Sequence, residues 1–329
     1  MLRRRPPVER LRAIPRVLAL AGCGIGICIP QTLPVAQDLI LRGVTADQLQ
    51  KQIDSIVALT GFVILPDLTA SNLSISGQSS EDTEILITQM GDGFTVSDDF
   101  PLYLEGVLGF LRYDPKFLVS DGTSETLLPL KWNTIAATAG VGWNFPITDE
   151  FSIRPMLNGT LAHVESDVSV AGRILEAETG RSLDFLQGGQ MDIFGYGGSI
   201  VLDYERYRPG NEIDVELRYT HLHLENFSDD PVLKAGAEAI TATVWARYRE
   251  PTDMVFLDRP VRWVAEVAYS EFIGDQGDAL GLDRLASIGG GLEVDLSAVN
   301  GIVSRTRLLG RVLVGNNALG FSMGIGVSF

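Results

Sequence analysis

The three histidines are the residues of this chain best suited to proton chemistry near neutral pH. His221 and His223 stand two positions apart in the segment YTHLHLENF, and His163 stands alone. A nearby serine could act as a nucleophile, and His221, His223 and Glu225 would share one face of a strand, as metal ligands must. Glu225 occupies the position where a nucleophile would be needed. We therefore expect no enzyme, no metal site and no cofactor.

A second group of candidates consists of charged residues of both signs that recur on one parity of alternating segments. Arginine and glutamate side chains facing each other inside a narrow barrel would pair and partly fill it. The alternative is a lining that selects small anionic or zwitterionic solutes. The residues are Arg154, Glu216, Arg218, Arg247, Glu266, Glu293, Arg307 and Arg311.

The elements that must position these residues are strands, because apolar and polar residues alternate through much of the chain. The alternation is clear in IDVELRYT (213–220), ITATVWARY (240–248), RWVAEVAYS (262–270) and LASIGGGLEVDL (285–296). A sustained period of two, with aromatic residues near the strand ends, is typical of a membrane β-barrel. A soluble β-sandwich would also alternate, but it gives no reason for an aromatic residue at the end of the chain.

Twelve strands are predicted, which makes the fold all-β: a single antiparallel transmembrane barrel over residues 61–329. An open sheet of this length would expose edges, and closure removes them. The predicted strands are 62–75, 83–96, 101–113, 128–145, 151–165, 191–205, 212–225, 238–249, 262–273, 285–296, 304–314 and 320–329.

If both ends of the barrel's chain lie in the periplasm, short periplasmic turns must alternate with external loops that can be longer, and the connections follow this order. Segments 146–150 and 206–211 are short, as periplasmic turns should be, and 166–190 is the longest, as expected for an external loop. Segment 250–261 is the exception, because it is long for a periplasmic turn.

The last strand carries a further signal. It alternates apolar residues up to a terminal phenylalanine, and this ending resembles the assembly signal of bacterial outer-membrane proteins, which implies recognition by the barrel-assembly machinery. The matching residues are Phe321, Met323, Ile325, Val327 and Phe329.

The first 36 residues have the layout of a secretory signal peptide. Six arginines up to Arg16 precede Val17 to Ile29, a run of 13 uncharged residues that is too short to span a bilayer. We expect cleavage after residue 36, with lipidation of Cys23 as an alternative. Cys23 and Cys28 are the only cysteines, so the mature chain would hold no disulfide.

Residues 37–60 form the N-terminal segment of the expected mature chain. Thr45 can cap a helix, and apolar residues recur at helical spacing from Leu49 to Val57, which predicts one amphipathic helix over 46–59.

A helix followed by twelve strands and this ending resembles the translocator domain of autotransporters over residues 45–329. The resemblance implies a helix in or under the lumen and a pore that is narrow or plugged. Only residues 37–44 would precede the helix cap, so we expect a solitary, porin-like barrel without a passenger.

Two other functions stay open. The segment with His221 and His223 is similar to the His-x-Ser-Asn segment of outer-membrane lipid A deacylases, which would imply a lipid acyl hydrolase, although Glu225 replaces the serine. The loop 166–190 could instead dock a partner, since loops often carry recognition.

The surroundings of the barrel follow from these expectations. On one face of the predicted strand, every second residue is apolar from Ile213 to Tyr219, and the next two are His221 and His223. This change predicts that the two histidines lie at the external rim of the membrane, beside outer-membrane lipid and lipopolysaccharide head groups. The net charge of −16 makes nucleic acid an unsuitable partner. We expect a monomeric barrel in the bacterial outer membrane.

Overall fold

The computed structural model describes residues 54–64, 72–75, 83–114, 116–120, 125–129, 131–166, 190–227, 235–295 and 305–328. The predicted signal peptide with Cys23, residues 46–53 of the predicted helix, loop residues 167–189 and Phe329 lie outside these ranges. Their assignments therefore stay predictions.

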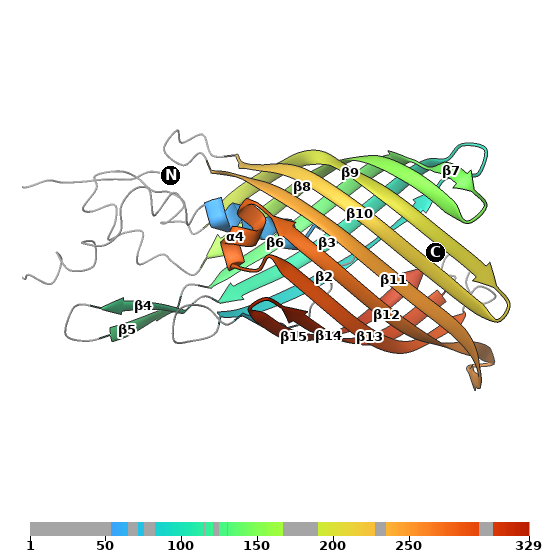
Figure 1. Ribbon diagram of the computed structural model, residues 1–329. Coiled ribbons are helices and arrows are strands. Elements are labelled where there is room, and N and C mark those ends of the chain that lie inside the picture. The colour runs from blue at the N-terminus through green and yellow to red at the C-terminus, as the bar shows by residue number, and fades with distance from the viewer. Residues whose placement is uncertain are drawn as a thin grey trace, which may run out of the picture. The chain divides into compact units, whose positions relative to one another are not determined.

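The described residues form fifteen strands, a helix over 54–59 and two further short helical elements (Figure 1). In chain order, the helix over 54–59 is followed by η2 (Thr60–Phe62), β1 (Asn72–Ile75), β2 (Thr83–Thr95), β3 (Leu102–Asp114), β4 (Lys116–Ser120), β5 (Glu125–Pro129), β6 (Trp132–Trp143), β7 (Phe145–Thr148), β8 (Phe151–Ser166), β9 (Gln190–Arg208), β10 (Asn211–Asn226), β11 (Gly236–Phe256), β12 (Arg259–Ile273), α4 (Asp275–Leu280), β13 (Arg284–Asp295), β14 (Arg305–Gly315) and β15 (Ala318–Ser328).

Twelve antiparallel strands close into a ring. The hydrogen-bonded order runs β6-β3-β2-β1-β15-β14-β13-β12-β11-β10-β9-β8, and β8 also pairs with β6. The first and last strands meet where Ile75 pairs with Ala318. Each strand of the ring therefore has two partners, and the predicted twelve-stranded antiparallel barrel is confirmed.

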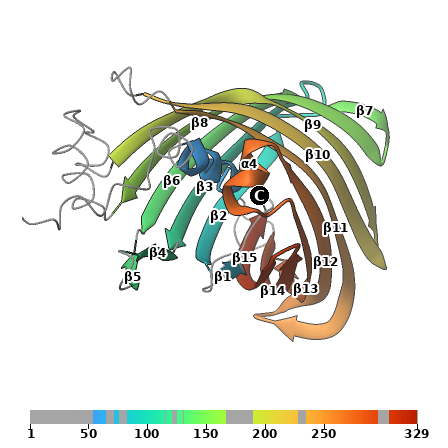
Figure 2. The same ribbon diagram turned by 60° about the vertical axis from the view of Figure 1, so that its left-hand side comes forward.

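Two ends of the barrel can be told apart (Figures 1 and 2). At the end called here the turn end, two-residue turns at 209–210 and 257–258 join neighbouring strands. At the opposite end, called the helix end, lie α4, the helix over 54–59, and the separate two-stranded sheet β4–β5. The predicted strand 128–145 is corrected accordingly, because residues 125–129 pair with β4 and the ring strand begins at Trp132.

The predicted first strand, 62–75, is wrong in its N-terminal part. Thr60–Phe62 form a 3-10 helix that continues the helix over 54–59, and the described strand begins only at Asn72. A short apolar run has the same composition in a buried helical turn as in a buried strand, so the pattern could not separate the two.

The interpretation of 250–261 as a long connection is also wrong. β11 continues to Phe256 and β12 begins at Arg259, with a register shift between Pro251 and Val255. Leu257 and Asp258 make the turn, with φ of 49° and 59°. Positive φ at both central residues matches the twist of a two-residue hairpin. The region is thus strand joined by a tight turn, as the parity of the connections requires.

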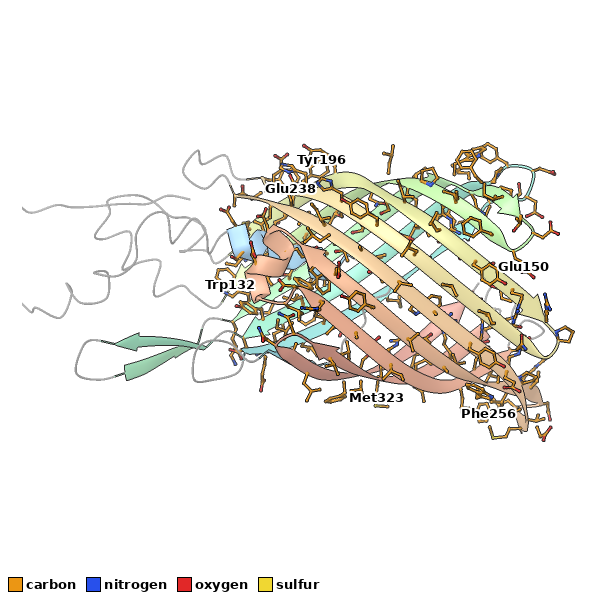
Figure 3. The ribbon with its side chains drawn as sticks, viewed as in Figure 1. Trp132, Glu150, Tyr196, Glu238, Phe256 and Met323 are labelled. Carbon is orange, nitrogen blue, oxygen red and sulfur yellow. The ribbon has the colours of Figure 1, made fainter. Side chains whose placement is uncertain are left out.

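Large apolar side chains cover the outer face of the ring. Leu157 is 76% exposed, Met323 67% and Ile288 66%, whereas the inward Val201 and Ile193 are fully buried. Figure 3 shows Met323 on the outer face between the two ends. A soluble monomer rarely exposes so much apolar surface, whereas a closed barrel in lipid requires it. The chain is a β-barrel of the outer-membrane type.

Candidate functional site

The helix over 54–59 and the turn that follows it lie inside the ring at its helix end. Residues 54–64 are called the lumen segment here. Val57, Ala58 and Val63 are 0% exposed and Phe62 is 1% exposed. They belong to one apolar cluster with inward residues of eleven ring strands and with Leu282, which follows α4. The apolar residues Ile56 to Leu59 that end this helix need such an enclosure, and the barrel provides it.

The wall of the barrel is shaped to receive this segment. A Cβ atom at Gly109 of β3 would lie 2.2 Å from the carbonyl oxygen of Val63, so only glycine fits that position. Across the lumen, the rings of Phe62 and Phe272 of β12 are 4.6 Å apart. Gln89 of β2 donates a hydrogen bond to the carbonyl oxygen of Phe62. The lumen segment thus contacts opposite sides of the ring.

Hydroxyl and amide groups form the next layer toward the turn end. Thr138 and Thr160 share a hydrogen bond of 2.8 Å between their hydroxyls. Asn158 donates to Ser199, whose hydroxyl also lies 2.8 Å from that of Thr220. These hydrogen bonds pair the buried hydroxyls with one another and with the Asn158 amide nitrogen, so the layer adds order without adding charge.

Ion pairs fill the layer below. Arg218 of β10 donates two hydrogen bonds, of 2.9 and 2.6 Å, to the carboxylate of Glu105 on β3. Its Nε also donates to Glu216 at 2.9 Å. Arg154 of β8 pairs with Asp203 at 2.6 Å and stacks on the ring of Tyr103. The Arg218–Glu105 pair spans the lumen, because β10 and β3 are not neighbours in the ring.

Nearer the turn end, three carboxylates each lie beside two or more arginines. Glu266 accepts from Arg247 at 2.5 Å and from Arg311 at 2.6 Å. Glu212 accepts from Arg262 and from Arg305, both at 2.6 Å. Glu293, only 1% exposed, lies between further arginines, Arg249 at 3.6 Å and Arg307 at 3.5 Å. The layer is therefore a connected network of both signs rather than a ring of one sign.

The structure places all eight charged residues singled out from the sequence inside the lumen. Each of them forms an ion pair, either with another of the eight or with a further charged residue of the lumen. Sequence reasoning missed their partners Glu105, Asp203, Asp214 and Arg249. It also missed Glu212, which pairs with Arg262 and Arg305 in the same lumen. Parity could have found some of them, since Glu212 and Asp214 share the parity of Glu216. Parity could not say which residues meet across the lumen.

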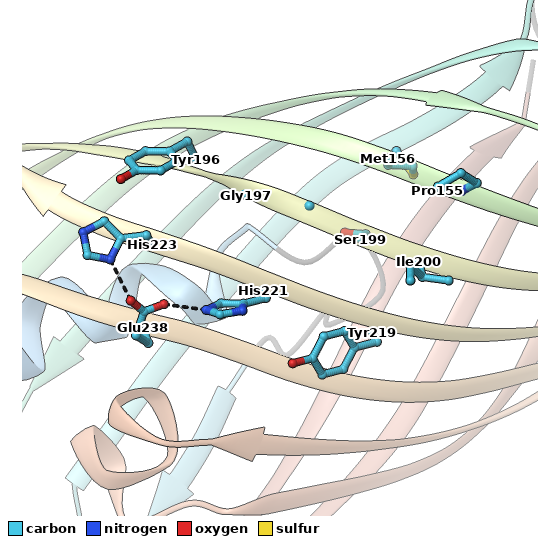
Figure 4. A pocket seen from close by; sticks show the side chains of 11 residues that line it. Pro155, Met156, Tyr196, Gly197, Ser199, Ile200, Tyr219, His221, His223 and Glu238 are labelled. Atoms are coloured by element: carbon cyan, nitrogen blue, oxygen red, sulfur yellow. Dashed lines mark hydrogen bonds and ion pairs between the residues drawn. The ribbon is translucent and has the colours of Figure 1, made fainter.

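The two rim histidines lie on the outer face near the helix end and bind one carboxylate (Figure 4). His221 Nε2 lies 2.6 Å from one oxygen of Glu238, and His223 Nδ1 lies 2.7 Å from the other. Glu238 belongs to the neighbouring strand β11, where it pairs with His223. Glu225, on which the sequence argument depended, takes no part in these two hydrogen bonds.

A hollow of about 690 Å³ opens beside this cluster on the same outer face. Its floor includes Gly198, which pairs with His221 of β10 and Leu157 of β8. Tyr196 and Ile200 flank Gly198 along β9. A Cβ at Gly198 would lie 2.8 Å from the carbonyl oxygen of Met156, so the close approach of β8 keeps this position without a side chain.

The lining of the hollow does not supply a nucleophile to the imidazoles. Ser199 is 4% exposed, and its hydroxyl bonds into the lumen with Asn158 and Thr220. Within the described ranges, no group of three or more His, Cys, Asp or Glu is placed to hold a metal ion.

In the same ranges, no helix has the length and apolar character to cross a membrane.

The remaining sequence candidates whose side chains are described, namely His163, Phe321, Met323 and Ile325, lie on the outer face. His163 pairs with Asp192 at 2.6 Å on β8 and β9. Of the terminal strand, Phe321, Met323 and Ile325 are 58%, 67% and 74% exposed, and Val327 lies on the same strand.

Comparisons with known proteins give matches in structure. No protein-family model matches the chain, and no curated protein matches its sequence. The chain is similar to the β domain of the Bordetella autotransporter BrkA, with 12% identity and a TM-score of 0.46, over 79% of this chain and 96% of that one. It is similar to the transport unit of AIDA-I from Escherichia coli, with 11% identity and a TM-score of 0.46, over 87% and 100%.

A third match is the translocator domain of NalP from Neisseria meningitidis, with 12% identity and a TM-score of 0.40, over 78% of this chain and 85% of that one. The closed ring of twelve strands and its apolar outer face make the chain a β-barrel of the outer-membrane type, and the translocator domains of autotransporters are among the solved structures to which it is similar.

Proposed function

We propose that this chain is an autotransporter-translocator-like pore of the bacterial outer membrane that the lumen segment holds closed. The observation that carries the proposal is the burial of residues 54–64: Val57, Ala58 and Val63 have no exposed surface inside an apolar ring of side chains. Ions need a hydrated path, and a dry apolar layer blocks it.

The ionic network is the weaker barrier in this proposal. Side chains of Arg262 and Arg305 are 23% and 24% exposed, so solvent reaches the network from the turn end. Paired charges in contact with water can hydrate a narrow path, which the apolar layer cannot. Release of the lumen segment alone should therefore open the pore.

The orientation and assembly of the barrel belong to the same proposal. Tight turns at 209–210 and 257–258 suit the periplasmic side, which leaves the helix end outside. We propose that the barrel-assembly machinery recognises the terminal strand through the apolar row that begins with the exposed Phe321, Met323 and Ile325. We also propose that the barrel is a monomer.

The experiment is single-channel recording of the refolded mature chain, residues 37–329, in planar bilayers. The test variant is Gly109→Leu, whose side chain would occupy the place of the Val63 carbonyl group. The matched control is Gly106→Leu on the same strand, where a Cβ meets no atom within 4 Å. We expect closed wild-type and control proteins and steady openings of Gly109→Leu.

A deletion of residues 38–64 tests the same point without altering the wall. It should conduct as Gly109→Leu does. If both the deletion and Gly109→Leu stay closed while the folded barrel is present by heat-modifiability on gels, the lumen segment is not the barrier. Steady conductance of the wild-type chain would also overturn the proposal.

A further inference from the structure

We infer that the hollow beside His221, His223 and Glu238 binds an acylated saccharide, a glycolipid from the leaflet at the helix end. The proposal concerns the outer face alone, so it does not depend on whether the lumen is plugged.

The hollow lies where the outer face changes from apolar to polar. Along β10 the outward residues run from Leu217 and Tyr219, which are 48% and 45% exposed, to His221 and His223. An amphiphile lying along this wall would therefore have its acyl chain beside Ile200 and its head group beside the histidines. The position of the hollow in the barrel thus selects a lipid rather than a soluble ligand.

A missing side chain makes room for the acyl chain. Gly198 is outward-facing between Tyr196 and Ile200, and its neighbours across the strands are Leu157 and His221. The approach of the Met156 carbonyl oxygen excludes a side chain at Gly198. The floor of the hollow at Gly198 is therefore held at the level of the backbone by the fit of β8 against β9.

The polar groups decide the class of head group. Glu238 accepts hydrogen bonds, while the imidazoles and the hydroxyl of Tyr219 can donate them. A head group that offers only acceptors, such as a phosphate, would bring negative charge against Glu238. Hydroxyl groups can both donate and accept, so they match this mixed set.

Aromatic rings support the same assignment. The rings of Tyr196 and His223 meet edge to face with centroids 5.5 Å apart, and Figure 4 shows Tyr219 on the opposite side of the hollow from Tyr196. Such rings offer a rigid apolar surface with a polar edge, which suits the faces and hydroxyls of a sugar ring.

The experiment is photocrosslinking in phosphatidylcholine vesicles that carry the refolded mature chain. One arm contains a glucosyl diacylglycerol with a diazirine in its acyl chain, and the other contains phosphatidic acid with the same chain. Mass spectrometry of the crosslinked peptides reports labelling on β9 and β10. We expect the glucosyl lipid to label these peptides about tenfold more than phosphatidic acid, the ratio that one additional hydrogen bond to a charged group gives.

Two variants test the polar groups, and both change exposed side chains. Glu238→Gln and the double variant His221→Ala with His223→Ala should lower labelling by the glucosyl lipid to the level of phosphatidic acid. His163→Ala is the matched control, since His163 also pairs with a carboxylate on the outer face but does not line the hollow. It should leave labelling unchanged.

The opposite results would overturn the inference. Equal labelling by the two lipids means that the wall contacts any acyl chain, and stronger labelling by phosphatidic acid means a phosphate site. Undiminished labelling of Glu238→Gln and the double variant, with folding verified by heat-modifiability, would remove the cluster from the site.

Discussion

Arg218 and Glu105 join two strands across the lumen although 113 positions separate them in the chain. The two hydrogen bonds between their planar groups, at 2.9 and 2.6 Å, are buried, with side chains 6% and 5% exposed. A bidentate pair of this kind fixes the distance between β10 and β3. It braces the interior on the turn-end side of the layer of hydroxyl and amide groups.

Breaking this pair should destabilise the barrel. Arg218→Met leaves Glu105 as an unpaired buried charge, which costs about 3–5 kcal/mol of unfolding free energy. Lys131→Met is the control, because it breaks a pair with Asp114 whose side chains are 35% and 25% exposed, and it should cost less than about 1 kcal/mol. Urea unfolding in vesicles, followed by tryptophan fluorescence, measures both. If Arg218→Met and Lys131→Met lower the unfolding free energy by equal amounts, the Arg218–Glu105 pair does not stabilise the barrel more than a surface pair does.

Replacing both members should restore much of the loss. The double variant Glu105→Leu with Arg218→Met removes the unpaired charge and leaves apolar groups, so its unfolding free energy should exceed that of Arg218→Met alone. The same urea titration gives the difference. A double variant that is less stable than the single one would mean that Glu105 has other essential partners.

The turn at the end of β11 offers a stabilising change. Leu257 and Asp258 hold positive φ, which costs a residue with a Cβ about 1–2 kcal/mol. Leu257→Asn together with Asp258→Gly should raise the unfolding free energy by about 1 kcal/mol, since these residues favour this turn. Leu257→Val, with a branched Cβ, should lower it. Urea titrations of the three proteins check the order, and a destabilised Asn-Gly variant would contradict the turn geometry.

Truncation of Phe62 should loosen the lumen segment without unfolding the barrel. Phe62→Ala removes the ring that packs on Phe272 and leaves a cavity, a change worth about 3–5 kcal/mol in a protein core. Amide hydrogen exchange should accelerate over residues 54–64 while the strands stay protected. Phe94→Ala, on the outer face and 57% exposed, is the control. Unchanged exchange in 54–64 would mean that Phe62 does not anchor the segment.

Charge selectivity should respond to Glu266 once the pore is open. In the Gly109→Leu background, Glu266→Gln removes the carboxylate shared by Arg247 and Arg311, so the lumen gains positive character. The reversal potential in a KCl gradient should shift toward the equilibrium potential of chloride, because the pore becomes more selective for anions. Glu271→Gln, an exposed carboxylate on the same strand, should leave it unchanged. An unmoved reversal potential in Glu266→Gln would place the conducting path elsewhere.

Some features were hidden from the sequence for identifiable reasons. The turn at Leu257 and Asp258 lacks the glycine or asparagine that marks such turns, so an apolar strand looked like a loop. The lumen segment beyond residue 59 looked like a strand, because burial on all sides removes the polar face by which a helix is recognised. Glu238 was missed as the partner of the histidines, because it belongs to a different strand.

The sequence by itself determined the fold of the barrel. Alternation has a period of two in any strand, so it assigned the inward and outward faces, and the twelve segments and their parity followed from local chemistry. The lumen charges and the outward row of the terminal strand were readable for the same reason.

Only the tertiary structure decided which residues meet. The contact between Gly109 and Val63 and the Arg218–Glu105 pair depend on the curvature of a closed ring, which brings distant strands to opposite walls of one lumen. The hollow beside Glu238 likewise depends on the register of three neighbouring strands around Gly198. A period of two fixes the face of each residue, but closure and register fix its neighbours across strands.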